Sequence, residues 1–329
     1  MTYLRLIFTL LLVAIGSLII ASLLGSTPLP AGRFISALIG SGEINDRIVI
    51  WEIRMPRAIA AFVVGAALGL SGAALQALLR NPLAEPGVLG VSAFSVLGAT
   101  LVLFYGVAAI SPILVPLAAI AGAFIATGIL LVAAIRTSSV VTLILIGVGL
   151  SSFAGALMAL LLNLAPNPFA LSDLITWTLG SVANKSMSDL TFVLPFIIIG
   201  TGVIYAVRRE LSALTLGEET TFGLGVDLKH TRLATVLGTG LLTGAAVSIA
   251  GAIGFVGIVA PHIVRPMVQF RAEQTLLPSA LLGGIMLVIA DIGVRLIPSS
   301  TELRLGVVAA LIGAPIFVWI AIKRRAGNG

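Results

Sequence analysis

The sequence contains few of the chemical groups that soluble enzymes and metal proteins use. It has no cysteine and only two histidines in 329 residues, which excludes disulfides, thiolate metal ligands and cysteine nucleophiles. Charged residues make up 10% of the chain, against about 25% in an average soluble domain. A water-soluble domain of any size does not fit this composition. We therefore predict one transmembrane domain that covers residues 1–329.

Motifs for nucleotide binding and for hydrolysis are absent as well. The sequence has no G-x-S-x-G or H-E-x-x-H motif and no phosphate-binding G-x-x-x-x-G-K-[ST] loop. The string nearest to that loop ends at Asn184–Ser186, with Leu179 and Asn184 at the glycine positions. His262 has no second ligand at a spacing that suits a metal site. We therefore expect no catalytic residue, no metal and no bound cofactor in this chain, and we do not expect an enzyme.

The chain consists mainly of apolar segments long enough to span a bilayer. A bilayer core of about 30 Å needs roughly 20 apolar residues in a helix. One segment has 32 residues, and we predict that it breaks near Ala252 into two helices. Strand-like alternation is absent, so helices are favoured over a β-barrel. The sequence predicts an all-α, polytopic membrane protein with ten transmembrane helices, from nine segments: Leu4–Leu24, Ala58–Leu79, Val88–Ile110, Pro112–Ile135, Val140–Leu164, Leu190–Val207, Leu233–Val264, Leu276–Ile297 and Leu303–Ile322.

Lysine and arginine predict the orientation of these helices. With the N-terminus inside, twelve of the nineteen basic residues fall on the inner side, which agrees with the excess of positive charge in cytoplasmic loops. Both termini are therefore expected in the cytoplasm. The net charge of +6 then reflects membrane topology rather than a nucleic-acid partner. We interpret the first segment as a retained helix and not as a cleaved signal peptide. The outer side receives seven basic residues: Arg33, Arg47, Arg54, Arg57, Lys185, Arg295 and Arg304.

Two other segments are too short to cross the bilayer. Residues Pro168–Leu179 show helical periodicity between two predicted spans, and we predict a short helix there, at about 168–179, on the outer side. The inner segment Arg208–Arg232 contains two helix-compatible runs, Glu218–Phe222 and Asp227–His230, separated by glycine. Two very short helices would form a compact element below the membrane. From the residues alone, this segment at about 208–232 is either a docking element for a cytoplasmic protein or a solvated loop.

Acidic residues are predicted to lie almost entirely outside the bilayer core. Glu85 is assigned to the inner surface, and Asp291 is the one acid inside an apolar segment. Asp291 stands one helical turn before Arg295, so we interpret it as an intrahelical partner of that arginine. Ion-coupled carriers keep ionisable residues at mid-membrane depth, and the sequence predicts none. The energy for transport is then expected from a partner. An ion-coupled secondary carrier is the alternative from another class.

Long motifs along the whole chain resemble one family. They include "WEIRMPRAIAAFVVGAALGLSGAALQALLRNPLAEPGVLGVS" (Trp51–Ser92), "LGEETTFGLGV", "AGAIGFVGIVAPHIVR" (Ala250–Arg265) and "ELRLGVVAALIGAPIFVWI". Together they resemble the signature of FecCD-type permeases, the membrane subunits of ABC importers for ferric siderophores, haem and cobalamin. The resemblance implies a bacterial inner-membrane permease with a second copy of itself, two cytoplasmic ABC ATPases that bind ATP-Mg, and a periplasmic or lipid-anchored binding protein.

The resemblance also implies the functional residues. Arg54, Arg57 and Arg295 match outer arginines that receive carboxylates of the binding protein, a task that suits the planar guanidinium. An ATPase-coupling element falls on Leu216, Gly217, Glu218, Glu219, Gly223 and Gly225. The inner gate falls on Ser138, Ser139, Val140 and Val141, where a cobalamin permease of this type has small hydroxyl residues. The implied cargo is therefore a bulky iron chelate, either a ferric siderophore or haem, with cobalamin as the alternative.

Overall fold

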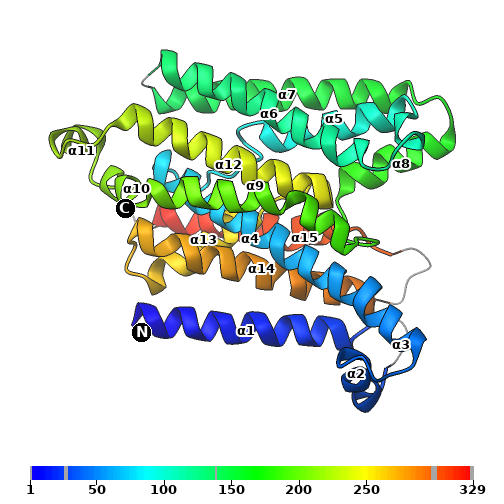
Figure 1. Cartoon of the computed structure of the whole chain (residues 1–329). Helices are drawn as coiled ribbons and strands as arrows, with labels where there is room; N and C mark the ends of the chain where they lie inside the picture. Colours follow the sequence, from blue (N-terminus) through cyan, green and yellow to red (C-terminus); the bar gives the residue numbers. More distant parts are fainter. Residues whose placement is uncertain (1, 26–28, 138, 298–301, 327–329) are drawn as a thin grey trace.

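The structure, a computed structural model, describes residues 2–25, 29–137, 139–297 and 302–326 and is a bundle of helices (Figure 1). Within these residues every regular element is a helix, which confirms the all-α prediction. The elements are α1 (Tyr3–Leu23), α2 (Ala31–Leu38), α3 (Ile44–Ile48), the π-helical turn η1 (Val49–Arg54), α4 (Met55–Leu78), α5 (Val91–Phe104), the 3₁₀ turn η2 (Val107–Ala109), α6 (Leu114–Arg136), α7 (Val140–Asn163), α8 (Pro168–Leu179), α9 (Met187–Ala206), α10 (Arg208–Leu214), α11 (Glu218–Gly223), α12 (Leu228–Ala250), α13 (Val256–Met267), α14 (Ala272–Leu296) and α15 (Leu305–Ala326).

Seven helices of the described chain are long and apolar enough to cross a membrane. They are α1, the continuous stretch Ile44–Leu78 that ends in α4, and α6, α7, α9, α12 and α14. The α4 stretch starts well before the predicted Ala58, because the chain is already helical from α3 onward. In contrast, α5 has only 14 residues, since Gly90 and Gly106 adopt left-handed conformations, with φ of 79° and 68°, at its two ends.

The two ends of the bundle carry different elements (Figure 1). Helices α10 and α11 lie at one end, where α1 also begins, and α2, α3 and α8 lie at the opposite end. We call these the α11 end and the α8 end. The predicted short helix at 168–179 is confirmed with these bounds by α8. Its first turn is capped by Asn167, whose side chain accepts a hydrogen bond from the Ala170 amide, and Pro168 occupies the first helical position.

The longest apolar segment breaks where the sequence predicted. Helix α12 ends at Ala250 and α13 begins at Val256, so the prediction of a break near Ala252 is confirmed. With 12 residues, α13 is about 18 Å long, shorter than the bilayer core. Gly251 and Phe255 both have a φ of 68°. Backbone that is not helical inside a membrane protein needs hydrogen-bond partners for its N–H and C=O groups. Other parts of the bundle provide such partners here.

Glu85 is one of these partners, and its predicted position is wrong. Its Oε2 accepts a hydrogen bond from the amide of Phe255 at 3.0 Å. Phe255 precedes α13, so the whole of that helix separates this carboxyl from Met267. The connection after α4 folds back into the bundle instead of staying at the surface. Gln76 of α4 supports the same region, because its Nε2 donates to the Gly257 carbonyl at 3.0 Å.

Small residues let α4 lie at the centre of the bundle. It is buried along nearly its whole length and packs against α12, α13 and α14. Gly65 and Gly69 face the backbone of Gly283 and Ser279 on α14, and Gly72 faces the backbone of Gly257 on α13. Lipid provides no hydrophobic drive between helices, so this close backbone contact is a main source of cohesion.

Candidate functional site

Three arginines that the sequence assigned to the outer surface, Arg54, Arg57 and Arg295, lie together at the α8 end of the bundle. Arg57 is on the first turn of α4 and Arg295 is on the last turn of α14. The Asp291 carboxylate lies between them and is 1% exposed. Arg57 Nε and Nη2 donate to Asp291 Oδ1 at 3.0 and 2.7 Å, and Arg295 Nε lies 3.1 Å from Asp291 Oδ2. The predicted Asp291–Arg295 pair is therefore confirmed, but Asp291 also holds Arg57.

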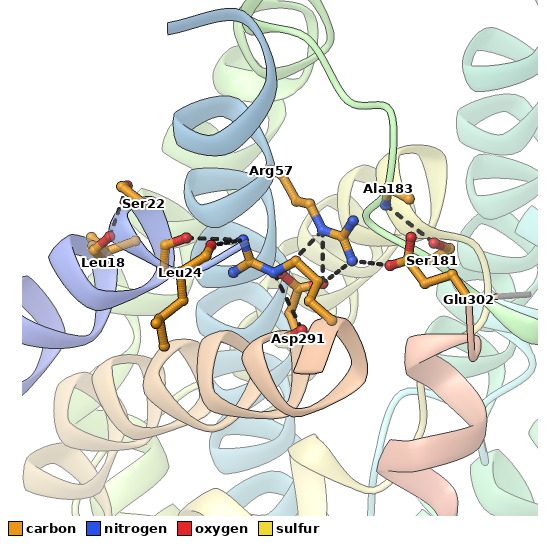
Figure 2. Close-up of polar contacts among 10 residues, drawn as sticks. Leu18, Ser22, Leu24, Arg57, Ser181, Ala183, Asp291 and Glu302 are labelled. Atoms are coloured by element: carbon orange, nitrogen blue, oxygen red, sulfur yellow. Dashed lines mark hydrogen bonds and ion pairs between the residues drawn. The ribbon is translucent and has the colours of Figure 1, made fainter. Parts of the chain in front are cut away.

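Arg57 has a second acidic partner. Its Nη2 is bonded to Glu302 Oε1 as well as to Asp291 (Figure 2). The Glu302 side chain is 39% exposed, whereas that of Arg57 is 12% exposed. Arg57 therefore links a buried carboxylate to one that faces the surface. Sequence reasoning missed this link, because Glu302 and Arg57 are 245 residues apart and no local spacing relates them.

Arg54 and Arg295 bind the end of α1. Arg54 Nη1 donates to the carbonyls of Ser22 and Leu23, and Arg295 Nη1 donates to those of Ala21 and Leu24 at 2.9 and 3.1 Å. The last carbonyls of a helix have no partners inside it and carry its partial negative charge, so cations stabilise this end. Arg54 is 4% exposed. The structure thus brings the three arginines together but engages all three within the chain.

The inner segment contains two short helices, one of them not predicted. Helix α11 confirms the expected helical run after Gly217. The second expected helix, Asp227–His230, is wrong, because Asp227 is the N-cap of the long helix α12 and its side chain accepts from the His230 amide at 3.0 Å. The other short helix is α10, directly after α9. An aspartate before an apolar run is a common N-cap signal, and it could have identified this boundary.

Residues Leu216–Gly225, here called the knob, present an apolar surface at the α11 end. The side chains of Leu216, Phe222 and Leu224 are 64%, 74% and 63% exposed. Thr221 is buried instead, and its hydroxyl donates to the Ala213 carbonyl of α10 at 2.8 Å. Gly217 and Gly225, with φ of 104° and 79°, form the turns at either side of α11. Exposed apolar side chains grouped in this way are typical of a protein-binding surface.

The predicted gate residues lie at the beginning of α7. Ser139 is the N-cap, and its Oγ accepts a hydrogen bond from the Thr142 amide at 3.2 Å. Val140 and Val141 form the first turn, and Val141 is 65% exposed. Ser138 lies outside the described residues. Most of α7 is exposed, with Leu145, Val148, Phe153 and Leu160 among its uncovered apolar side chains.

A cavity of about 640 Å³ lies beside α8. Trp177 and Lys185 line it, and the Lys185 ammonium is 5.3 Å from the centre of the Trp177 ring, within the range of a cation–π contact. Burial lowers the pKa of Lys185, and the charge of Asp189 offsets part of this shift. Across the described residues, no three His, Asp or Glu side chains approach closely enough to hold a metal ion.

The bundle and its seven bilayer-length helices define a multi-pass membrane protein, with exposed apolar side chains in the knob at one end. The comparison with protein families then identifies it. The chain belongs to the FecCD transport family, whose model matches residues 10–323. It is therefore a permease subunit of an ABC importer, a transport protein and not an enzyme.

Individual relatives agree with this assignment. The chain is 39% identical over 296 residues to an uncharacterized ABC transporter permease, YvrB of Bacillus subtilis. This match covers 88% of this chain and 83% of the relative. It is 36% identical over 326 residues to the vitamin B12 import system permease BtuC of Klebsiella pneumoniae. This match covers 99% of this chain and 95% of the relative. A solved structure described as an inward-facing conformation of a transporter assigned to the metal-chelate ABC type matches with a TM-score of 0.86 and 29% identity, over 97% of this chain and 99% of that one.

Proposed function

We propose that the chain imports a bulky metal chelate by alternating access, as one half of a permease dimer in the bacterial inner membrane. Ten embedded helices fit this proposal: the seven long ones together with α5, α13 and α15. Helix α1 begins, and α15 ends, at the α11 end (Figure 1), as expected for an even number of crossings with both termini in the cytoplasm. The exposed face of α7 fits a contact with the second copy.

The observation that carries the proposal is the knob. Leu216, Phe222 and Leu224 would contact water at this end of the bundle unless a partner covers them. A cytoplasmic ATPase that binds ATP-Mg is the partner we propose, because the chain has no phosphate-binding loop of its own. ATP binding and hydrolysis in that subunit would move the knob and shift the permease between states open to either side.

We propose cobalamin as the cargo to test first, because relatives such as the Klebsiella pneumoniae permease are named for vitamin B12 import. Ferric siderophores and haem are the second candidates, since the structural neighbour is assigned only to the metal-chelate type. Val140 and Val141 at the start of α7 also lack the hydroxyl groups expected of a cobalamin gate. A periplasmic or lipid-anchored binding protein would deliver the cargo and determine much of the specificity.

Purification of the tagged chain from its native membrane in mild detergent tests the proposal. We expect an ABC ATPase to co-purify and to hydrolyse ATP in a vanadate-sensitive way. In proteoliposomes, uptake of labelled cyanocobalamin should depend on ATP and on the binding protein, and ferrichrome and hemin are the comparison cargoes. Gradient-driven flux by the isolated chain, without ATPase, would contradict the proposal and support a secondary carrier.

For docking of the binding protein, we propose Arg57 as the arginine within reach, because its other partner, Glu302, is exposed. A carboxylate of the binding protein can replace Glu302 on this guanidinium. Arg57→Lys should weaken docking about tenfold, or about 1.4 kcal/mol, since lysine keeps the charge but loses the bidentate geometry. Glu302→Gln should strengthen it. Surface plasmon resonance on the reconstituted permease measures both.

The matched control for docking is Arg33, another arginine of the α8 end. It is paired with Glu43, the residue before α3, and with the buried Asp46 of α3, and it is not among the proposed docking residues. Arg33→Lys should leave the affinity unchanged. Equal losses for Arg33→Lys and Arg57→Lys would indicate a general effect of surface charge and would contradict a specific role of Arg57.

A further inference from the structure

Glu218, the first residue of α11, is attached to the two helices at the centre of the bundle. Its Oε1 lies 3.0 Å from Arg232 Nη2 of α12 and 3.8 Å from Nη2 of Arg80, in the connection just after α4. The Glu218 side chain is 32% exposed, whereas that of Arg232 is 6% exposed. One carboxylate of the knob therefore faces two cations, a buried one on α12 and a half-exposed one in the connection after α4.

Among the residues of α11, Glu218 is the one that forms ion pairs with arginines outside the knob. Beyond it, α11 packs mainly against α10 and α12, and Thr221 holds it to α10. The neighbouring acid, Glu219, is exposed. Arg232 is buried in the bundle, and a buried guanidinium requires a compensating charge. A displacement of α11 would separate this pair, so the ends of α12 and α4 are expected to follow it.

Arg232 on α12 and Arg80 just after α4 both belong to segments that lead to the break between α12 and α13. Helix α12 ends at that break, and Gln76 of α4 is hydrogen-bonded to Gly257, just after it. Glu85, in the connection that follows α4, accepts the hydrogen bond from Phe255. Arg80 belongs to the same connection. A movement applied at Glu218 can therefore reach the non-helical segment 251–255 by two routes, along the length of α12 from Arg232 and through the connection after α4 from Arg80.

We propose that Glu218 is a positioning residue that transmits movement of the knob to α12 and α4, rather than a residue that binds the ATPase. This inference rests on the proposed function, in which an ATPase moves the knob. Leu216, Phe222 and Leu224 provide the contact surface, and Glu218 connects that surface to the transmembrane helices. Binding of the ATPase and coupling to transport then depend on different side chains of one element.

The test separates binding from coupling with Glu218→Gln. In the full complex, the ATPase should still co-purify and its basal hydrolysis should stay within about twofold of that of the unchanged chain. Uptake of labelled cyanocobalamin per ATP hydrolysed should fall at least about tenfold, as expected when a coupling interaction is removed. The conservative variant Glu218→Asp keeps the charge and should recover most of the uptake. Glu273→Gln, on the first turn of α14 at the same end, is the matched control.

A second measurement, the distance-dependent coupling between two spin labels, tests the same inference in a chain that keeps Glu218. Because the chain has no cysteine, spin labels can be attached at Thr220→Cys on α11 and Lys229→Cys on α12 in an otherwise unchanged chain. The dipolar broadening between the labels should be the same in the nucleotide-free and vanadate-trapped complexes, because α11 and α12 move together. A change of the broadening between these states would overturn the inference.

The possible failures can be told apart. Normal uptake per ATP with Glu218→Gln overturns the role of Glu218 and leaves the proposed function intact. Loss of the ATPase from the Glu218→Gln complex, with unchanged label broadening in the parent chain, would assign Glu218 to binding and also overturn the inference. An unchanged chain that carries no ATPase at all would contradict the proposed function itself.

Discussion

Gly72→Leu is expected to prevent the chain from accumulating as a folded protein in the membrane. A Cβ at this position would overlap with the carbonyl oxygen and carbon of Gly257. Both atoms belong to backbone at the start of α13, so no flexible side chain can move aside. Separating the helices would also strain the Gln76–Gly257 hydrogen bond. We expect a cost above about 3 kcal/mol, the upper range for overpacking, against a total stability of about 5–15 kcal/mol.

The measurement is the yield of monodisperse protein in detergent, read by fluorescence-detected size exclusion of a fusion. The matched control is Gly202→Leu on α9, where a Cβ meets no atom within 4 Å and the residue is exposed. Its yield should equal that of the unchanged chain. Normal yield for Gly72→Leu would show that α4 and α13 are not in backbone contact and would contradict the packing described here.

Asp291→Asn should destabilise the folded chain by about 3–5 kcal/mol, the usual cost of leaving a buried charge without its partner. The substitution preserves shape and removes the only carboxylate that both Arg57 and Arg295 contact in the described structure. Arg57 retains Glu302, but Arg295 is left with carbonyl partners from α1. Reversible unfolding in mixed micelles of mild detergent and SDS measures the change in free energy.

Glu43→Gln is the control for this prediction. Glu43 pairs with Arg33 at 3.1 Å, but the two side chains are 74% and 51% exposed. Exposed pairs contribute about 0–1 kcal/mol, so the unfolding transition should hardly move. Similar effects of the two substitutions would contradict the central role of Asp291 in holding α4, α14 and the end of α1 together.

These two predictions concern different forces at the two halves of α4. Toward its α11 end the helix is held by contact between backbones, which requires glycine. At its α8 end it is held by the ion pair between Arg57 and Asp291, and Arg54, just before the helix, donates a hydrogen bond to the Ser22 carbonyl of α1. The contacts at the α8 end leave Arg57 close to the surface, because its second partner, Glu302, is exposed. A partner can thus reach this site without entering the packed part of the bundle.

Much of the architecture could be predicted from the sequence, because the bilayer imposes simple rules on composition. Apolar length alone identified α1, α6, α7, α9 and α14, and the helical periodicity of 168–179 identified α8 with its observed bounds. The pairing of Asp291 with Arg295 followed from their i,i+4 spacing. Each of these features depends on residues that are close together in the chain, so local patterns were sufficient.

Only the tertiary structure decided how distant residues meet. The position of Glu85 was predicted wrongly, because a charged residue near prolines suggests a surface turn, and nothing local shows that the turn folds back to Phe255. The same holds for the pairs Arg57–Glu302 and Glu218–Arg232, whose partners lie on separate helices. The sequence by itself determined an all-helical membrane protein and most of its helices, because apolar length and helical periodicity are local properties of the chain. The contacts that join the outer arginines to α1 and the knob to α12 depend on the packing of the whole bundle.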